Sequence, residues 1–333
     1  MTAGADGRPS SPAAATPIAG TITVIVAACL FATLGILARW AYAAGMVPLT
    51  FVAWRAGIGT AGLAVLGAWQ RRKGRPGVDL RAIGRRQQAT LVVAIGLACV
   101  LNLAMFFAFS RVPIGLALLC FYTYPAMVAA VGVISGREPL DRARAIALGL
   151  ATAGMVGVVV GDVNLAAGAS LDALGLLAAL GAAASQTAFV VLSRDGYRSV
   201  PTEQAMGTIL LGTTVLTALI AVLVGAGEAL LLPFQSPDVL PLLLVVGIAG
   251  AAIPSFLFLT GIRLIGGTRT GVLMLIEPVV GVLLAAILLH EGVAPLQVAG
   301  GAAILLAALI IQRAGRSATG EAEAAALPAP GGP

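Results

Sequence analysis

Long apolar stretches separated by short polar connections run along nearly the whole chain. A helix needs about 20 mostly apolar residues to cross the hydrocarbon core of a bilayer, and ten stretches meet that length. They cover residues 18–38, 50–69, 89–109, 113–134, 144–161, 171–193, 203–225, 239–262, 268–289 and 294–312. The pattern predicts an all-α integral membrane protein with ten transmembrane helices.

The composition supports a membrane protein. Of the 333 residues, 59% are hydrophobic and 10% are charged, and the mean hydropathy is +1.01. Soluble domains are usually about 45–50% apolar and about 25% charged, so this chain has too little polar surface to cover a water-soluble body of its size. The two ends, residues 1–17 and 313–333, are rich in small and polar residues and are predicted to be disordered.

The positive charges favour one orientation in the membrane. Most of the 20 Lys and Arg residues fall on one side if the N-terminus is cytoplasmic, and the other side receives Arg39 and Arg111. This positive-inside pattern predicts that both termini are cytoplasmic. The basic residues lie in short connections without interleaved aromatic residues, so no nucleic-acid partner is expected. The bilayer is the expected surrounding, and the oligomeric state is left open.

The chain also contains an internal repeat. Shifting it by 153 residues superposes several marked positions without a gap. The coinciding pairs are Val47-Pro48 with Val200-Pro201, Asn102 with Ser255, Pro125 with Pro278, and Glu138 with Glu291. We therefore expect two five-helix halves, 18–161 and 171–312, connected by a short segment. Because five is odd, the second half must be inverted, and inverted repeats are typical of secondary transporters that bind substrate near the midplane.

The motifs of the two halves resemble a known family. The ends of the halves read YPAMVAAVGVISGREPL (124–140) and EPVVGVLLAAILLHEGV (277–293). The second is similar to the EP-to-GE signature of EamA-type ten-helix members of the drug/metabolite transporter (DMT) superfamily, with His290 in place of the usual glycine. LFATLGILARW (30–40) and PLTFVAWRAG (48–57) resemble the opening helices of that family. The resemblance implies transport of small metabolites, commonly export, with a substrate that varies between members.

Glu277 is the only acidic residue deep inside a predicted span. An ionisable group within a membrane indicates a functional position. Three interpretations remain open for it. Glu277 could fix helix packing through hydrogen bonds, bind a proton and couple transport to it, or contact a cationic part of the substrate.

Pro125 and Pro278 lie near the middle of two symmetry-related spans. Each lacks the N–H that would bond to the carbonyl four residues earlier, and a freed carbonyl in a membrane must find a partner or a water-lined cavity. We therefore expect kinks at both positions. These kinks could be hinges for alternating access or static bends that aid packing.

Other polar side chains occur at similar depth. Together they suit a neutral or zwitterionic molecule better than a polyanion, although such groups often only join helices. With Glu277, the candidate substrate-binding residues are Asn102, Tyr122, Tyr124, Ser185, Gln186 and Ser255. Arg55, one or two turns inside its span, could reach the interface or point inward as a gate, and its neighbour Trp54 suits an interfacial position.

No pattern indicates an enzyme or a cofactor. The single His and three Cys form no metal-binding motif, and no nucleotide-binding or nucleophile motif is present. The sequence predicts a secondary transporter of the inner or plasma membrane that exports small metabolites such as amino acids through a central cavity. An importer, or a membrane scaffold without transport, remains an alternative.

Overall fold

The computed structural model describes most of the chain. The described residues are 17–109, 111–112, 114–136, 141–162, 172–236, 239–288 and 293–326. They fold into helices, and no strand occurs within these ranges. The residues outside them include 1–16 and 327–333 of the two predicted tails, and Glu138, His290 and Glu291 of the repeat motifs.

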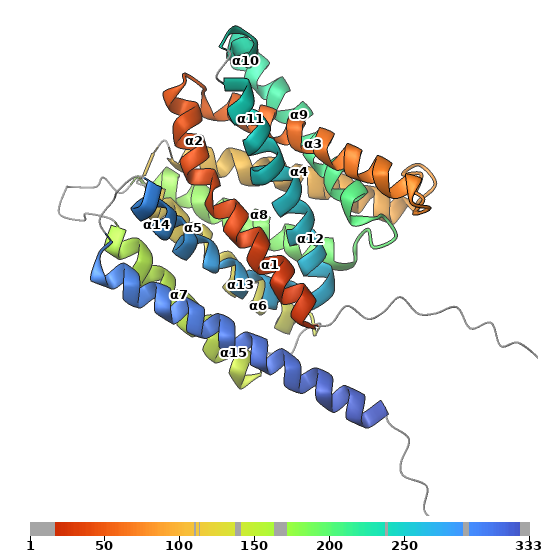
Figure 1. Cartoon of the computed structure of the whole chain (residues 1–333), viewed down its shortest axis with the longest axis vertical. Helices are drawn as coiled ribbons and strands as arrows, with labels where there is room; N and C mark the ends of the chain where they lie inside the picture. Colours follow the sequence, from red (N-terminus) through yellow and green to blue (C-terminus); the bar gives the residue numbers. More distant parts are fainter. Residues whose placement is uncertain are drawn as a thin grey trace, which may run out of the picture.

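The helices of the two halves follow one another along the chain and lie side by side in one bundle (Figure 1). The first half contains α1 (Pro17–Ala32), α2 (Leu34–Ala43), α3 (Pro48–Arg72), α4 (Arg85–Phe109), α5 (Ile114–Phe121), α6 (Tyr124–Ile134) and α7 (Arg142–Asp162). The second contains α8 (Ala173–Asp195), α9 (Thr202–Leu223), η2 (Glu228–Leu231), α10 (Leu232–Gln235), α11 (Val239–Gly247), the π-helical η3 (Ile248–Ala252), α12 (Ile253–Ile265), α13 (Gly267–Met274), α14 (Ile276–Leu288) and α15 (Pro295–Ala326).

These helices confirm the predicted membrane fold. Among the described residues, nine helical stretches are long and apolar enough to cross a bilayer, and Pro295–Ile311 of α15 is a shorter apolar stretch. The crossings form two five-helix repeats. Because each repeat contains an odd number of crossings, the second is inverted relative to the first.

Several crossings are interrupted where the apolar pattern alone predicts continuous helices. The break between α5 and α6 lies just before Pro125, and α13 ends at Met274, four residues before Pro278. Another proline, Pro254, follows the π-helical segment at the start of α12. A proline is tolerated in the first turn of a helix but not in its interior. Each of these helices therefore starts anew near its proline.

The last helix is longer than the apolar pattern predicts, whereas the interrupted crossings are shorter. The helix α15 extends to Ala326, whereas the apolar pattern ends at residue 312 and a disordered tail is predicted beyond it. Ala and Glu predominate in residues 317–326. Both are strong helix formers, so the polar end of α15 is compatible with a helix although it is too polar for a membrane span.

The two halves pack against each other throughout. The helix α7 lies along α15, α3 along α9, α4 along α8, and α1 along α12. Exchanging the halves converts the contact of α4 with α8 into that of α12 with α1. The interface between repeats is therefore the centre of the molecule, and neither half has a separate core.

Two polar contacts hold the connections between helices, one at Asp172 and one made by Arg263 near the end of α12. Arg111 Nη1 donates to Asp172 Oδ2 at 3.0 Å, and Asp172 Oδ1 accepts from the backbone at the start of α8. The Arg111 hydrogen bond is the main reason that the pKa of Asp172 is lowered. On the opposite side, Arg263 Nη1 donates to the Val200 carbonyl at 2.9 Å, and burial raises the pKa of the adjacent Tyr197 to about 12.

Small residues set the close approach of α7 and α15, which lie side by side in Figure 1. A Cβ added to Gly154 would meet the Gly300 carbonyl oxygen at 2.6 Å, and one added to Gly300 would meet the Gly154 carbonyl oxygen. Such backbone contact is typical of helix interfaces in membranes, where packing replaces the hydrophobic effect as the driving force.

We expect Gly300→Val to destabilise the protein by about 1–3 kcal/mol, since the added side chain must push the helices apart. Thermal unfolding of the detergent-solubilised protein measures this. Gly149→Ala is the control, because a Cβ at Gly149 on α7 meets nothing within 4 Å. An unchanged transition for Gly300→Val would contradict the close contact.

Candidate functional site

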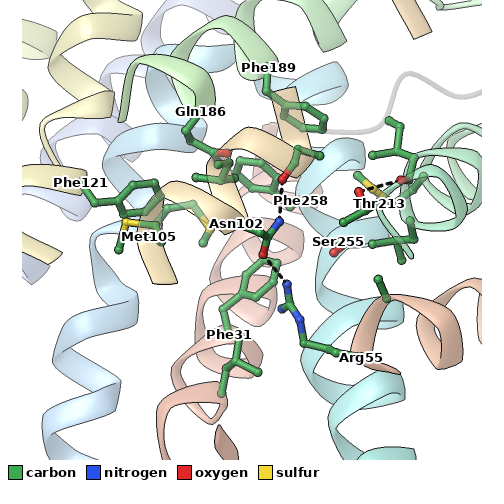
Figure 2. A pocket seen from close by; sticks show the side chains of 18 of the residues that line it. Phe31, Arg55, Asn102, Met105, Phe121, Gln186, Phe189, Thr213, Ser255 and Phe258 are labelled. Carbon is green, nitrogen blue, oxygen red and sulfur yellow. Dashed lines mark hydrogen bonds between the residues drawn. The ribbon is translucent and has the colours of Figure 1, made fainter. Parts of the chain in front are cut away.

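A cavity of about 250 Å³ lies between the two repeats, and Figure 2 shows it from close by. Elements of both halves line it, and its wall combines polar groups with aromatic and Met side chains. The lining residues are Phe31, Leu34, Arg55, Ala56, Ala98, Leu101, Asn102, Met105, Phe121, Tyr122, Tyr124, Gln186, Phe189, Met206, Ile209, Leu210, Thr213, Ser255, Phe258, Met274 and Glu277.

Arg55 points into this cavity from α3. Its Nη1 donates to the Gly250 carbonyl at 3.2 Å, and its Nη2 donates to Asn102 Oδ1 at 3.1 Å, as Figure 2 shows. The Asn102 amide is oriented by donating from Nδ2 to the Ala98 carbonyl at 2.7 Å. Arg55 Nε is buried and has no hydrogen-bond partner in the described part of the chain. The side chain therefore turns inward rather than toward the membrane interface.

The Gly250 carbonyl belongs to the π-helical segment η3. A π-helix changes the register of backbone hydrogen bonds and is frequent at functional sites. Here it supplies an acceptor to a cation that would otherwise be buried without a partner. The local irregularity of this crossing and the position of Arg55 are therefore parts of one arrangement.

Trp54, the neighbour of Arg55, takes a different direction. Its Nε1 donates to the Leu230 carbonyl at 2.9 Å, and its ring meets Phe234 edge to face with centroids 5.4 Å apart. Both partners belong to the η2–α10 connection. Trp54 thus attaches α3 to this connection and does not line the cavity.

Glu277 lies in the first turn of α14 and lines the cavity with Arg55. The Tyr122 hydroxyl is within hydrogen-bonding reach of its carboxylate, and Arg55 and Tyr124 are near enough to interact with it electrostatically. No direct ion pair joins Glu277 to Arg55 among the contacts of the described residues. Each charged group therefore keeps hydrogen-bonding capacity toward the cavity.

The structure separates the other polar residues that the sequence singles out. Gln186 and Ser255 line the cavity with Tyr122, Tyr124 and Asn102. Ser185 does not, because its side chain is buried and donates to the Leu97 carbonyl at 2.8 Å. Ser185 therefore joins α8 to α4, although it is the sequence neighbour of a lining residue.

Most of the cavity wall was not found from the sequence. It consists mainly of Phe, Met, Leu, Ile and Ala side chains, which look the same in a sequence whether they face lipid, core or cavity. The 153-residue shift was a usable signal, since it pairs Met105 with Phe258 just as it pairs Asn102 with Ser255. The residues missed include Phe31, Met105, Phe121, Phe189, Met206, Thr213, Phe258 and Met274.

The two helix breaks lie next to residues that line the cavity. Tyr124 directly precedes Pro125, and Glu277 directly precedes Pro278. At the first break Thr123 Oγ1 donates to the Cys120 carbonyl at 2.6 Å, which satisfies one of the backbone groups that the interruption frees. A Cβ on Gly271 would lie 3.1 Å from Pro125 Cβ, so the two interrupted crossings pack directly on each other.

The apolar packing differs between the two ends of the cavity. The largest buried cluster draws on every crossing and includes Ile83 and Val200 on the side of the connection 73–84. On the opposite side there are two separate clusters. One surrounds Phe51 and Leu243, and the other surrounds Ala108 and Ala179. The apolar packing is therefore continuous on the side of the connection 73–84. On the opposite side the two smaller clusters are separate, and the large cluster reaches that side only along α7, at Val158 and Val159.

Comparison with known proteins agrees with this architecture. The model of the EamA-like transporter family matches residues 18–160 and 173–313, which confirms the family resemblance found in the sequence. A solved structure titled only as the crystal structure of a protein is similar with a TM-score of 0.74 and 22% sequence identity, over 90% of this chain and 98% of that chain. At this identity the similarity supports the fold alone. Comparison with curated proteins finds no match.

The contrast between two serines gives a test of the cavity. On a background in which Cys29, Cys99 and Cys120 are replaced by Ala, we expect Ser255→Cys to react with a small water-soluble methanethiosulfonate reagent. Ser185→Cys is the matched control and should react at least about tenfold more slowly, because only thiolates that water reaches react readily. Mass spectrometry of the intact protein measures the labelling. Equal rates would contradict the assigned cavity wall.

Proposed function

Because the chain belongs to the EamA-like transporter family, we propose that it is a secondary transporter that exports a small neutral or zwitterionic metabolite, such as an amino acid. The observation that carries this proposal is the cavity between the repeats, which holds one cationic and one acidic side chain in an otherwise aromatic and Met-rich wall. A scaffold that transports nothing would not need such a cavity.

The two charged groups support a zwitterionic substrate. A guanidinium binds a carboxylate through charge-assisted hydrogen bonds, and Arg55 has a free Nε. Glu277 can accept hydrogen bonds from a substrate ammonium group. Their charges cancel, which disfavours a polyanion, and the Phe and Met side chains offer apolar surface for the rest of the molecule.

The packing of the cavity ends supports alternating access. The side with two separate apolar clusters is the proposed opening in this conformation, and the continuous cluster is the proposed barrier. The interrupted crossings at Pro125 and Pro278 are the proposed hinges, because their helix halves can change angle without breaking regular hydrogen bonds. Since the connections with most Lys and Arg residues lie on the barrier side, we place that side and both termini in the cytoplasm.

The proposal is tested first by finding the substrate. Metabolites in the medium of cells that overexpress the protein are compared with those of cells that express Arg55→Lys at the same level. We expect one or a few zwitterionic metabolites to accumulate outside only with the unchanged protein. Accumulation of polyanions, or depletion of a metabolite from the medium, would overturn the substrate class or the direction.

Reconstituted protein then tests the two charged residues. We expect Arg55→Lys and Glu277→Gln each to weaken the apparent affinity in substrate counterflow about 10- to 100-fold, because a hydrogen bond to a charged group contributes about 1.5–3 kcal/mol. Glu228→Gln, in the η2 connection outside the cavity, is the control. Unchanged affinity in both cavity variants would exclude them as substrate contacts.

The Glu277→Gln variant also distinguishes the three roles open to Glu277. If Glu277 carries a proton, Glu277→Gln should abolish substrate-driven proton movement into liposomes while counterflow continues. If it only binds substrate, affinity falls and the proton movement per substrate is unchanged. If it is structural, the melting temperature falls and transport per folded molecule is retained.

For the hinges, we expect Pro125→Ala and Pro278→Ala to slow transport at least about threefold while substrate affinity stays the same, since a restored helix hydrogen bond stiffens the crossing. Flux and binding in liposomes measure the two effects separately. A rate equal to that of the unchanged protein in both variants would show that the breaks are static bends.

A further inference from the structure

A second cavity of about 200 Å³ lies between α3 and α9, separate from the central one. It is an open groove on the outside of the helix bundle, where Ala64 and Leu211 are exposed. Gly67 and Gly207 leave the space between the helices unfilled. Within a bilayer, such a groove faces lipid.

The length of the groove matches one leaflet. Its lining extends along α3 from Thr60 to Arg71, which at 1.5 Å per residue is about 16 Å, roughly half of the hydrocarbon thickness of about 30 Å. Trp69, with Lys73 Nζ at 3.9 Å from its ring centroid, marks the membrane interface near the charged end, since Trp is typical of that level. Toward the midplane the groove is lined mainly by apolar side chains, and the hydroxyls of Thr60 and Thr208 there already donate to backbone carbonyls of their own helices. At the headgroup level the groove is charged.

Two guanidinium groups lie at the charged end. Arg71 and Arg75 line the groove, and the guanidinium of neither forms a hydrogen bond or ion pair within the described ranges. Glu203 contributes one carboxylate to the lining, so the net charge there is positive. Arg72 and Lys73 add further positive charge next to it.

The charged end is a fixed structure. Gln204 of α9 accepts from the Val78 backbone N–H at 2.9 Å and donates to the Val78 carbonyl at 2.5 Å. This double hydrogen bond holds the connection 73–84 against α9. It therefore keeps Arg75 beside Arg71 at the mouth of the groove.

We propose that this groove binds an anionic phospholipid of the adjacent leaflet. Its phosphate binds Arg71 and Arg75, and the first part of one acyl chain lies over Ala64 and Leu211. Arginine pairs match phosphate geometry, and basic pockets between transmembrane helices bind anionic headgroups. A free phosphate ion would leave the apolar part of the groove unused. The proposal does not depend on the transported substrate.

Native mass spectrometry of the purified full-length protein tests this binding. The protein is titrated with phosphatidylglycerol, and with phosphatidylethanolamine for comparison. We expect Arg71→Gln with Arg75→Gln to weaken phosphatidylglycerol binding roughly tenfold or more. Arg85→Gln with Arg86→Gln removes the same charge from exposed positions outside the groove and should weaken it less than roughly threefold.

Substitutions that do not alter the charge test the apolar part of the groove. Ala64→Phe fills the groove and should reduce lipid binding, whereas Ala61→Phe, on an exposed position of α3 outside the groove, should not. Equal losses in the two Arg double variants would overturn the proposal in favour of a diffuse basic surface. Preferred binding of phosphatidylethanolamine, or a change of oligomer mass with Ala64→Phe in place of lipid loss, would also overturn it.

Discussion

The bilayer interior contains no water to satisfy a free backbone group or a charge, and this constraint explains where the irregular parts of the protein lie. Non-helical backbone at membrane depth is tolerated only where it faces protein or a cavity. The π-helical segment and the breaks before Tyr124 and Ile276 all occur beside the central cavity. A single hydrogen bond satisfies both a backbone group of the π-helical segment and a buried charge, because the buried guanidinium of Arg55 donates to the Gly250 carbonyl.

The repeats share a scaffold but differ in the chemistry that they bring to it. A shift of 153 residues superposes Tyr124 on Glu277 and Arg55 on Thr208. One half therefore supplies the cation and the other supplies the acid. Symmetric helices can pivot in equivalent ways, while an asymmetric cavity can recognise the two unlike ends of one molecule.

The pair α3 and α9 connects the two sites that we describe. Arg55 extends from α3 into the cavity, and about four turns later in the same helix Arg71 lies at the charged end of the lipid-facing groove. A lipid bound between α3 and α9 would contact both repeats at once.

The sequence by itself determined the class, the crossings, the inverted repeat and the family, because each depends on length, hydropathy and spacing along the chain. It also singled out Arg55, Asn102 and Glu277, which line the cavity, since polar groups are rare in an apolar span and are costly there without a partner. It did not determine direction around a helix axis. Ser185 bonds to a backbone carbonyl while Gln186 lines the cavity, and Phe31 or Met274 cannot be distinguished in the sequence from lipid-facing residues. Only the packing of one half on the other decided these orientations, because a uniformly apolar helix has no polar face to indicate which side turns inward.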